Sequence, residues 1–66
     1  MASTGTEVMD RILLELEDRR NWFERAIAVA VRDGDYASAL AREARLKETR
    51  HLIAYIDGDL REELEV

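Results

Sequence analysis

Apolar residues recur at seven-residue intervals in two series along the chain. The first series is Met9, Leu16, Phe23 and Ala30, and the second, after Gly34, is Ala39, Leu46, Ile53 and Leu60. A seven-residue repeat keeps its members on one side of an α-helix, as in coiled coils. If the chain reverses direction at Gly34, the two series meet in opposite order, as the helices of a hairpin do. The pattern therefore predicts an all-α protein built as an antiparallel two-helix hairpin.

Capping residues predict where each helix begins and ends. Thr4 and Glu7 have the capping-box spacing, so the first helix is expected to begin near Thr4 or Thr6. Gly34 can adopt the left-handed conformation that ends a helix, and Asp35 can cap the next one. The expected single domain has a helix over about 5–33, a turn at 33–35 and a helix over about 35–64.

A second Asp-Gly-Asp motif at 57–59 leaves two alternatives for the end of the second helix. The helix can continue through Gly58 at a cost of about 1 kcal/mol, which keeps Leu60 and Leu64 in phase with the apolar pattern. Alternatively, the helix breaks there, and Asp59 with Glu62 caps one last short turn. Continuation is the favoured alternative.

Further apolar residues flank the expected contact between the helices. The seam is expected to include, beside the two series, Leu13, Ile27, Ile12, Ala26, Thr49 and Ile56. A different large-to-small seam is also compatible with the pattern, with Phe23 against Ala44 and Ala30 against Ala37. The sequence does not rank these two registers.

A second apolar surface remains outside the seam. The candidate interface consists of Trp22, Val29, Ala37, Leu40, Ala41, Ala44, Leu52 and Tyr55, with Val8 also beyond the seam. Large exposed apolar surfaces usually mark an interface. A two-fold pair of hairpins would cover this surface as a homodimeric four-helix bundle, which is the expected assembly. The alternative is an obligate complex with a different, unidentified protein.

The length of the chain also favours association. Ordering each of 66 residues costs roughly 1.5 kcal/mol, and two helices side by side bury too little apolar surface to offset it. Disulfides, metals and oligomerisation are the usual supplements in small domains. With no Cys and a single His, stabilisation by disulfides or by a metal is effectively excluded. Self-association or binding to a partner protein remains.

Composition excludes several classes of protein. The absence of Pro, with 47% hydrophobic and 38% charged residues, is typical of long helices and not of a disordered tail. A net charge of −5 argues against phosphate binding over the whole surface. The longest uncharged run near the middle, 26–31, is far below the roughly 20 residues of a membrane span. No secretory signal is recognised at the N-terminus, so a cytoplasmic location is expected by default.

The only basic cluster lies along the middle of the second helix. Its candidate nucleic-acid contacts are Arg42, Arg45, Lys47 and Arg50, and His51 adjoins them. Rop-like helical-hairpin dimers, which bind structured RNA, share this length and expected shape, although no residue pattern matches. Glu43 and Glu48 lie within the same cluster and would neutralise much of it as helical neighbours. The favoured interpretation of this cluster is therefore a set of solvated ion pairs, and nucleic-acid binding is the less favoured one.

No constellation for catalysis accompanies these residues. His51 lacks a second His, a Cys or a nucleophile beside it, and the carboxylates of the first helix mostly lie on its outer side. Paired-carboxylate chemistry needs a desolvated pocket that a two-helix rod lacks. No catalytic residue, metal ligand or cofactor is therefore assigned, and an enzyme is not expected.

Two features interrupt the regular pattern of the first helix. Arg19 and Arg20 fall between Leu16 and Phe23, so at least one of them must lie at the seam, with its aliphatic stem over the core and its guanidinium reaching water or Glu48. Trp22 lies outside the seam, where an uncovered indole is costly. It is expected to be covered by a second copy or to anchor a different partner.

Two resemblances are consistent with a hairpin module. The segment 34–40 resembles the start of a helix in tetratricopeptide repeats, and Tyr36, Ala39 and Leu46 are similar in spacing to UVR-type hairpins. The chain departs from the UVR pattern at Glu43-Ala44, where an Arg-Asp pair belongs, and 66 residues do not supply a repeat array. The expected function is that of a small protein-protein interaction or regulatory module, with a helical subunit of a larger complex or a Rop-like RNA binder as alternatives.

Overall fold

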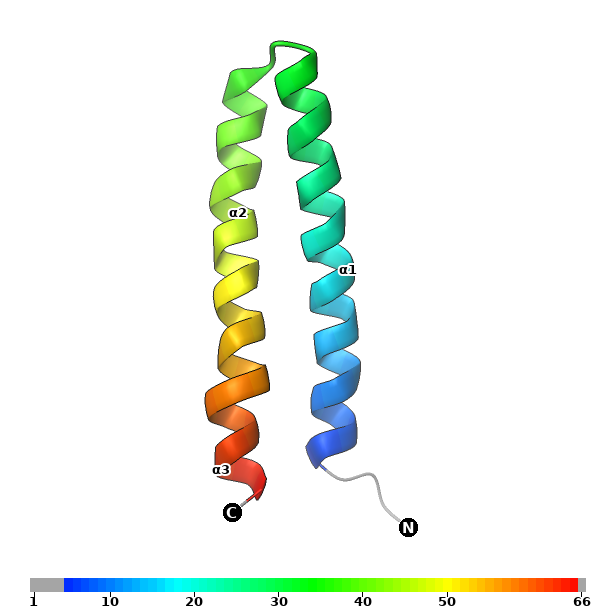
Figure 1. Cartoon of the computed structure of the whole chain (residues 1–66), viewed down its shortest axis with the longest axis vertical. Helices are drawn as coiled ribbons and strands as arrows, with labels where there is room; N and C mark the ends of the chain where they lie inside the picture. Colours follow the sequence, from blue (N-terminus) through cyan, green and yellow to red (C-terminus); the bar gives the residue numbers. More distant parts are fainter. Residues whose placement is uncertain (1–4, 66) are drawn as a thin grey trace.

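The computed structural model describes residues 5–65, and the side chains of 5–63, as an antiparallel helical hairpin (Figure 1). Its elements are α1 (Gly5–Arg32), α2 (Tyr36–Ala54), the π-helix η1 (Tyr55–Leu60) and α3 (Arg61–Glu65). All secondary structure over this range is helical, which confirms the all-α hairpin. The start of α1 lies beside α3 at the end opposite the turn, hereafter the open end. The expected cap residue Thr4 lies outside the described residues.

The tight turn is formed by Gly34 and Asp35, the two residues that the sequence predicted to end the first helix and to cap the second. Gly34 adopts φ +77°, where a side chain would be strained, and its amide donates to the Val31 carbonyl at 3.1 Å. The Asp35 amide donates to the Ala30 carbonyl at 2.8 Å, which completes a Schellman ending for α1. The Asp35 carboxylate then accepts a hydrogen bond from the Ser38 amide at 3.2 Å, which caps α2.

The same cap makes stability depend on pH. Hydrogen bonds from the Ser38 side chain and backbone, followed by the weaker attraction of Arg42, lower the pKa of the Asp35 carboxyl. Because the folded pKa is depressed, this stabilisation is present above the unfolded pKa and is lost as the pH falls through the folded value. Asp35→Asn keeps an acceptor but removes the titration, so the difference in unfolding midpoint between wild type and variant should shrink below about pH 4. A difference that stayed constant down to about pH 2 would contradict this account.

The second Asp-Gly-Asp motif does not break the helix. Gly58 lies inside η1, and α2, η1 and α3 follow one another without an intervening loop, so the helical path continues to Glu65. The turn at Tyr55–Leu60 is nevertheless wider than an α-helical turn, a change of winding that the sequence did not predict. Arg61, which follows it, is 23% exposed and donates to Asp10 in α1 at 2.6 Å.

Gly34 and Gly58 should respond in opposite ways to substitution by alanine. A Cβ at Gly58 would meet no atom within 4 Å, so Gly58→Ala should raise the free energy of unfolding by about 0.5–1 kcal/mol, mainly by restricting the unfolded chain. A Cβ at Gly34 also meets no atom, but its left-handed φ makes Gly34→Ala destabilising by about 1–2 kcal/mol. Chemical unfolding at one protein concentration measures both. Loss of stability in Gly58→Ala would mean that η1 requires glycine.

The core is a thin strip between the helices. Its buried apolar side chains are Met9, Leu13, Ala30, Ala39 and Leu46, all at most 8% exposed. Leu16, Phe23, Ile53 and Leu60 are half-buried, so every member of the two heptad series turns inward. Thr49 is buried as well, and its hydroxyl donates to the Arg45 carbonyl in its own helix at 2.9 Å. Ile12 corrects the expected seam, because it is 42% exposed and lies at the outer edge.

Candidate interaction surface

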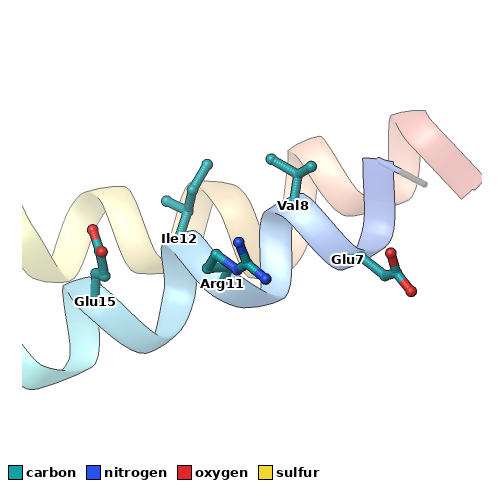
Figure 2. Close-up of a pocket in the computed structure, with 5 residues that line it drawn as sticks. All are labelled: Glu7, Val8, Arg11, Ile12 and Glu15. Carbon is teal, nitrogen blue, oxygen red and sulfur yellow. The ribbon is translucent and has the colours of Figure 1, made fainter. Parts of the chain in front are cut away.

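One side of α1 carries a second, largely apolar stripe beside the core stripe. Its members follow one another at alternating intervals of four and three, which keeps them on one side of a helix. They are Val8, Ile12, Glu15, Arg19, Trp22, Ala26 and Val29. Val8 and Trp22 are each 51% exposed, and Ile12 and Val29 are 42% and 44% exposed. Figure 2 shows Val8, Ile12 and Glu15 projecting from the same side of α1, where they line a shallow depression with Glu7 and Arg11.

The second helix contributes a matching stripe on the same side of the hairpin. Its members, again at intervals of four and three, are Ala41, Arg45, Glu48, Leu52 and Tyr55. A shallow groove between the helices shows that the two stripes lie on the same side of the hairpin. Arg19 of α1 lines this groove together with Arg45, Glu48 and Leu52 of α2. Leu16, Phe23 and Thr49 line the same groove, so it opens onto the core. We call the surface formed by the two stripes the Trp22 face.

Trp22 is positioned by its neighbours and yet remains half exposed. Its ring meets Phe23 edge-on, with the ring centroids 5.2 Å apart and an angle of 78° between the planes. The guanidinium carbon of Arg42 lies 5.8 Å from the Trp22 centroid, in the range of a cation–π contact. Arg42 also donates to the Ala26 carbonyl at 3.5 Å, which links α2 to α1. The indole is therefore held in one orientation with an open side.

The opposite broad side of the hairpin is ionic. Asp10 follows Val8 by two positions and Glu24 follows Trp22 by two, which is about 200° around an α-helix. Arg50 of α2 donates to Glu24 at 2.9 Å, and Arg61 donates to Asp10 at 2.6 Å. The Arg61 Nε also lies 3.5 Å from Asp57. Charged side chains thus connect the helices on this side, whereas apolar side chains lie open on the other.

The structure divides the candidate interface predicted from sequence. Its members on the Trp22 face are Trp22, Val29, Ala41, Leu52 and Tyr55. Leu40 and Ala44 instead line a separate depression with Glu43, Lys47 and Arg50, and Ala37 lies one turn before Leu40. Leu40 is 68% exposed among these charged neighbours. The apolar positions of α2 extend around more of the helix than one interface can cover.

The predicted basic cluster is divided in the same way. Arg42 and Arg45 lie on the Trp22 face, whereas Lys47 and Arg50 line the depression beside Leu40. Arg50 is paired with Glu24 of α1, whereas the sequence analysis considered only neutralisation of the cluster within the second helix by Glu43 and Glu48. His51 lies near Lys47 and Arg50 on that same outer surface. The four candidate nucleic-acid contacts therefore do not form one basic surface.

Arg19 and Arg20, which interrupt the apolar pattern of the first helix, lie close to the seam, as expected. Arg20 is half-buried, and its Nε and Nη2 lie 3.4 Å from the Asn21 side-chain oxygen. Arg19 is exposed but lines the groove of the Trp22 face beside Glu48.

Sequence reasoning missed Arg61 and Ile12 as functional candidates. The four-residue spacing from Val8 to Ile12 was a usable signal for Ile12, whereas the contact between Arg61 and Asp10 depends on the tertiary structure.

Neither a metal site nor a membrane span is found in the described part of the chain. Within residues 5–65, no group of three or more His, Cys, Asp or Glu side chains is arranged to hold a metal ion. No helix in this range is both long enough and apolar enough to cross a bilayer. No protein-family model matches the chain, and comparisons with curated proteins and with solved structures give no significant match.

Proposed function

We propose that the chain is a small, non-enzymatic protein-protein interaction or regulatory module that works as a homodimer of helical hairpins. The observation that carries this proposal is the Trp22 face, where a half-exposed indole and a row of exposed aliphatic side chains extend along the hairpin. Soluble monomers rarely leave contiguous apolar surfaces of this kind open. Packing two such faces together gives a four-helix bundle, in which the shallow groove between the helices becomes interior.

The surface area of the hairpin supports association. The chain exposes 5224 Å², whereas a compact domain of 7.6 kDa exposes about 4,300 Å². The hairpin is a single layer of helices with extents of 50 × 21 × 11 Å. One broad side of that layer covers on the order of 1,000 Å², which exceeds the roughly 800 Å² per partner of a typical stable interface. A second layer on the Trp22 face would therefore bury enough surface for a specific dimer.

The shape of the surface depressions favours a binding module over an enzyme. The depressions along the hairpin are shallow and open to solvent, whereas catalytic sites are usually deep and largely desolvated. A Rop-like RNA-binding role is less favoured because Arg42 and Arg45 face away from Lys47 and Arg50. A helical subunit of a larger complex would use the same Trp22 face, and the experiment below separates it from a homodimer.

Sedimentation equilibrium over a wide concentration range, with helicity followed by circular dichroism on the same samples, tests the proposal. The expected result is a helical species with twice the 7.6 kDa chain mass. A helical monomer at all concentrations would overturn the homodimer and leave the Trp22 face for a different protein. A chain that is unfolded alone would likewise overturn it, because the fold would then depend on a foreign partner.

A further inference from the structure

The net charge of the chain is concentrated at the open end of the hairpin. Residues 5–12 and 55–65 together hold seven acidic and two basic residues, a net charge of −5 that equals the charge of the whole chain. The remaining residues hold eight of each sign and are neutral. The hairpin is therefore electrically polar along its length, with an acidic open end.

The Trp22 face has the same polarity. Near the open end, Tyr55 lines a shallow depression with Asp59, Glu62 and Glu63. Toward the turn, Arg42 lies over Trp22, and Arg45 lines the central groove beside Arg19. Glu48 lines that groove too, so the face is acidic toward the open end and carries more basic than acidic side chains toward the turn. Such a surface is complementary to its own copy only when that copy is reversed end to end.

We propose that the partner on the Trp22 face is a second copy of the chain, packed with its turn at the opposite end. This inference rests on the homodimer proposed above and adds the orientation of the two hairpins. The two-fold axis lies at the level of Leu52. Arg45 precedes Leu52 by seven positions and Asp59 follows it by seven, so a reversed copy brings Arg45 of one chain to Asp59 of the other.

The first helix supports the same axis independently. Leu16 lines the central groove together with Leu52, so this part of α1 and Leu52 lie at the same height. Glu15 and Arg19 lie two positions on either side of position 17, which adjoins Leu16, so reversal about an axis at that height brings Glu15 of one copy opposite Arg19 of the other. The same operation brings Ile12 opposite Trp22. One axis thus matches opposite charges and apolar side chains on both helices.

The competing arrangement, with both turns at the same end, is electrostatically unfavourable. It brings two open ends, each with a net charge of −5, against one another. Exposed charges interact strongly within the Debye length, about 8 Å at physiological ionic strength. Reversal moves the two acidic ends apart by most of the 50 Å length of the hairpin, where their repulsion is screened.

Charge reversal tests both the face and the orientation. Arg45→Glu should weaken the dimer at least about tenfold in sedimentation equilibrium at low salt, because each copy then presents an acid to Asp59 of the other. Lys47→Glu is the matched control, since it makes the same change in charge beside Leu40, and it should leave the dimer unchanged. Adding Asp59→Arg to Arg45→Glu should restore affinity. These two positions are about 21 Å apart along one helix, so rescue within a single chain is not expected.

A distance measurement decides the orientation directly. The chain has no Cys, so Ala37→Cys, outside the Trp22 face, can carry a single spin label. Ala37 precedes Leu52 by fifteen positions, so the two labels should lie about 45 Å apart by pulsed dipolar spectroscopy. A dimer with a separation below about 30 Å, the width of a bundle, would overturn the reversed arrangement while leaving the homodimer intact. A monomer would instead refute the proposed function itself, and equal effects of Arg45→Glu and Lys47→Glu would overturn the face.

Discussion

Leu46→Ala is expected to leave the chain largely unfolded at room temperature. Leu46 is 5% exposed in the strip of core between α1 and α2, and truncating such a leucine costs about 2–5 kcal/mol. A domain of this size has a total stability of only about 3–5 kcal/mol from its core. Loss of one central side chain therefore removes most of it. Thermal unfolding followed by circular dichroism at one protein concentration measures the effect.

Leu40→Ala is the matched control for this prediction. It makes the same chemical change in the same helix, but Leu40 is 68% exposed, so the expected change is within about 0.5 kcal/mol. A near-zero loss for Leu46→Ala would reject the observed seam. A large loss for Leu40→Ala would return Leu40 and Ala44 to the candidate interface, where the sequence had included them.

The hairpin could be predicted because its information is local and periodic. Met9, Ala30, Ala39 and Leu46 are buried where the seven-residue repeat placed them, and Gly34 adopts the left-handed conformation expected at the turn. Ala37 and Ala44 are exposed, which excludes the alternative large-to-small seam for the hairpin. A repeat of this kind selects both the helical state and the inward side of each helix, so two independent properties follow from one pattern.

The change of winding at Tyr55–Leu60 could not be predicted in the same way. Gly58 costs a continuing helix only about 1 kcal/mol relative to Ala, which does not decide between continuation and termination. The π-turn continues the helical path but widens it, which was neither of the two alternatives. The wider turn is followed by Arg61, which reaches both Asp10 in the other helix and Asp57 one turn earlier. Such a contact depends on which residues the hairpin brings together, and no pattern within one helix encodes it.

The sequence identified the apolar residues of the candidate interface but not which of them lie on the same side of the hairpin. Trp22, Leu52 and Tyr55 were recognised as apolar residues beyond the seam, and they are half exposed on one broad side. The helical pattern alone could not separate them from Leu40 and Ala44, because it does not say on which side of the hairpin each flank of α2 lies. The Arg42 contact with Trp22 fixes that side, and it joins residues twenty positions apart. Tertiary contacts therefore decide the boundaries of the surface.

Trp22→Ala should weaken self-association on the order of a hundredfold. An indole that is 51% exposed and already oriented by Phe23 and Arg42 loses little conformational freedom when a second copy covers it. Aromatic side chains of this kind are typical hot spots, and removing one costs about 2–4 kcal/mol of binding free energy. Sedimentation equilibrium measures the change, and circular dichroism at concentrations where the variant is still dimeric reports whether the hairpin remains folded.

Leu14→Ala is the matched control for the Trp22 prediction, because Leu14 is 63% exposed in the same helix but follows Ile12 by two positions and so points away from the Trp22 face. It should leave the dimer affinity within a factor of about two, which is near the limit for a neutral surface change.

The single Trp also reports association in the unmodified chain, and its emission should shift to shorter wavelength as the concentration rises. If the dimer forms while the emission stays red-shifted and Trp22→Ala has no effect, another surface carries the association, and the ion-paired side of the hairpin becomes the one to test.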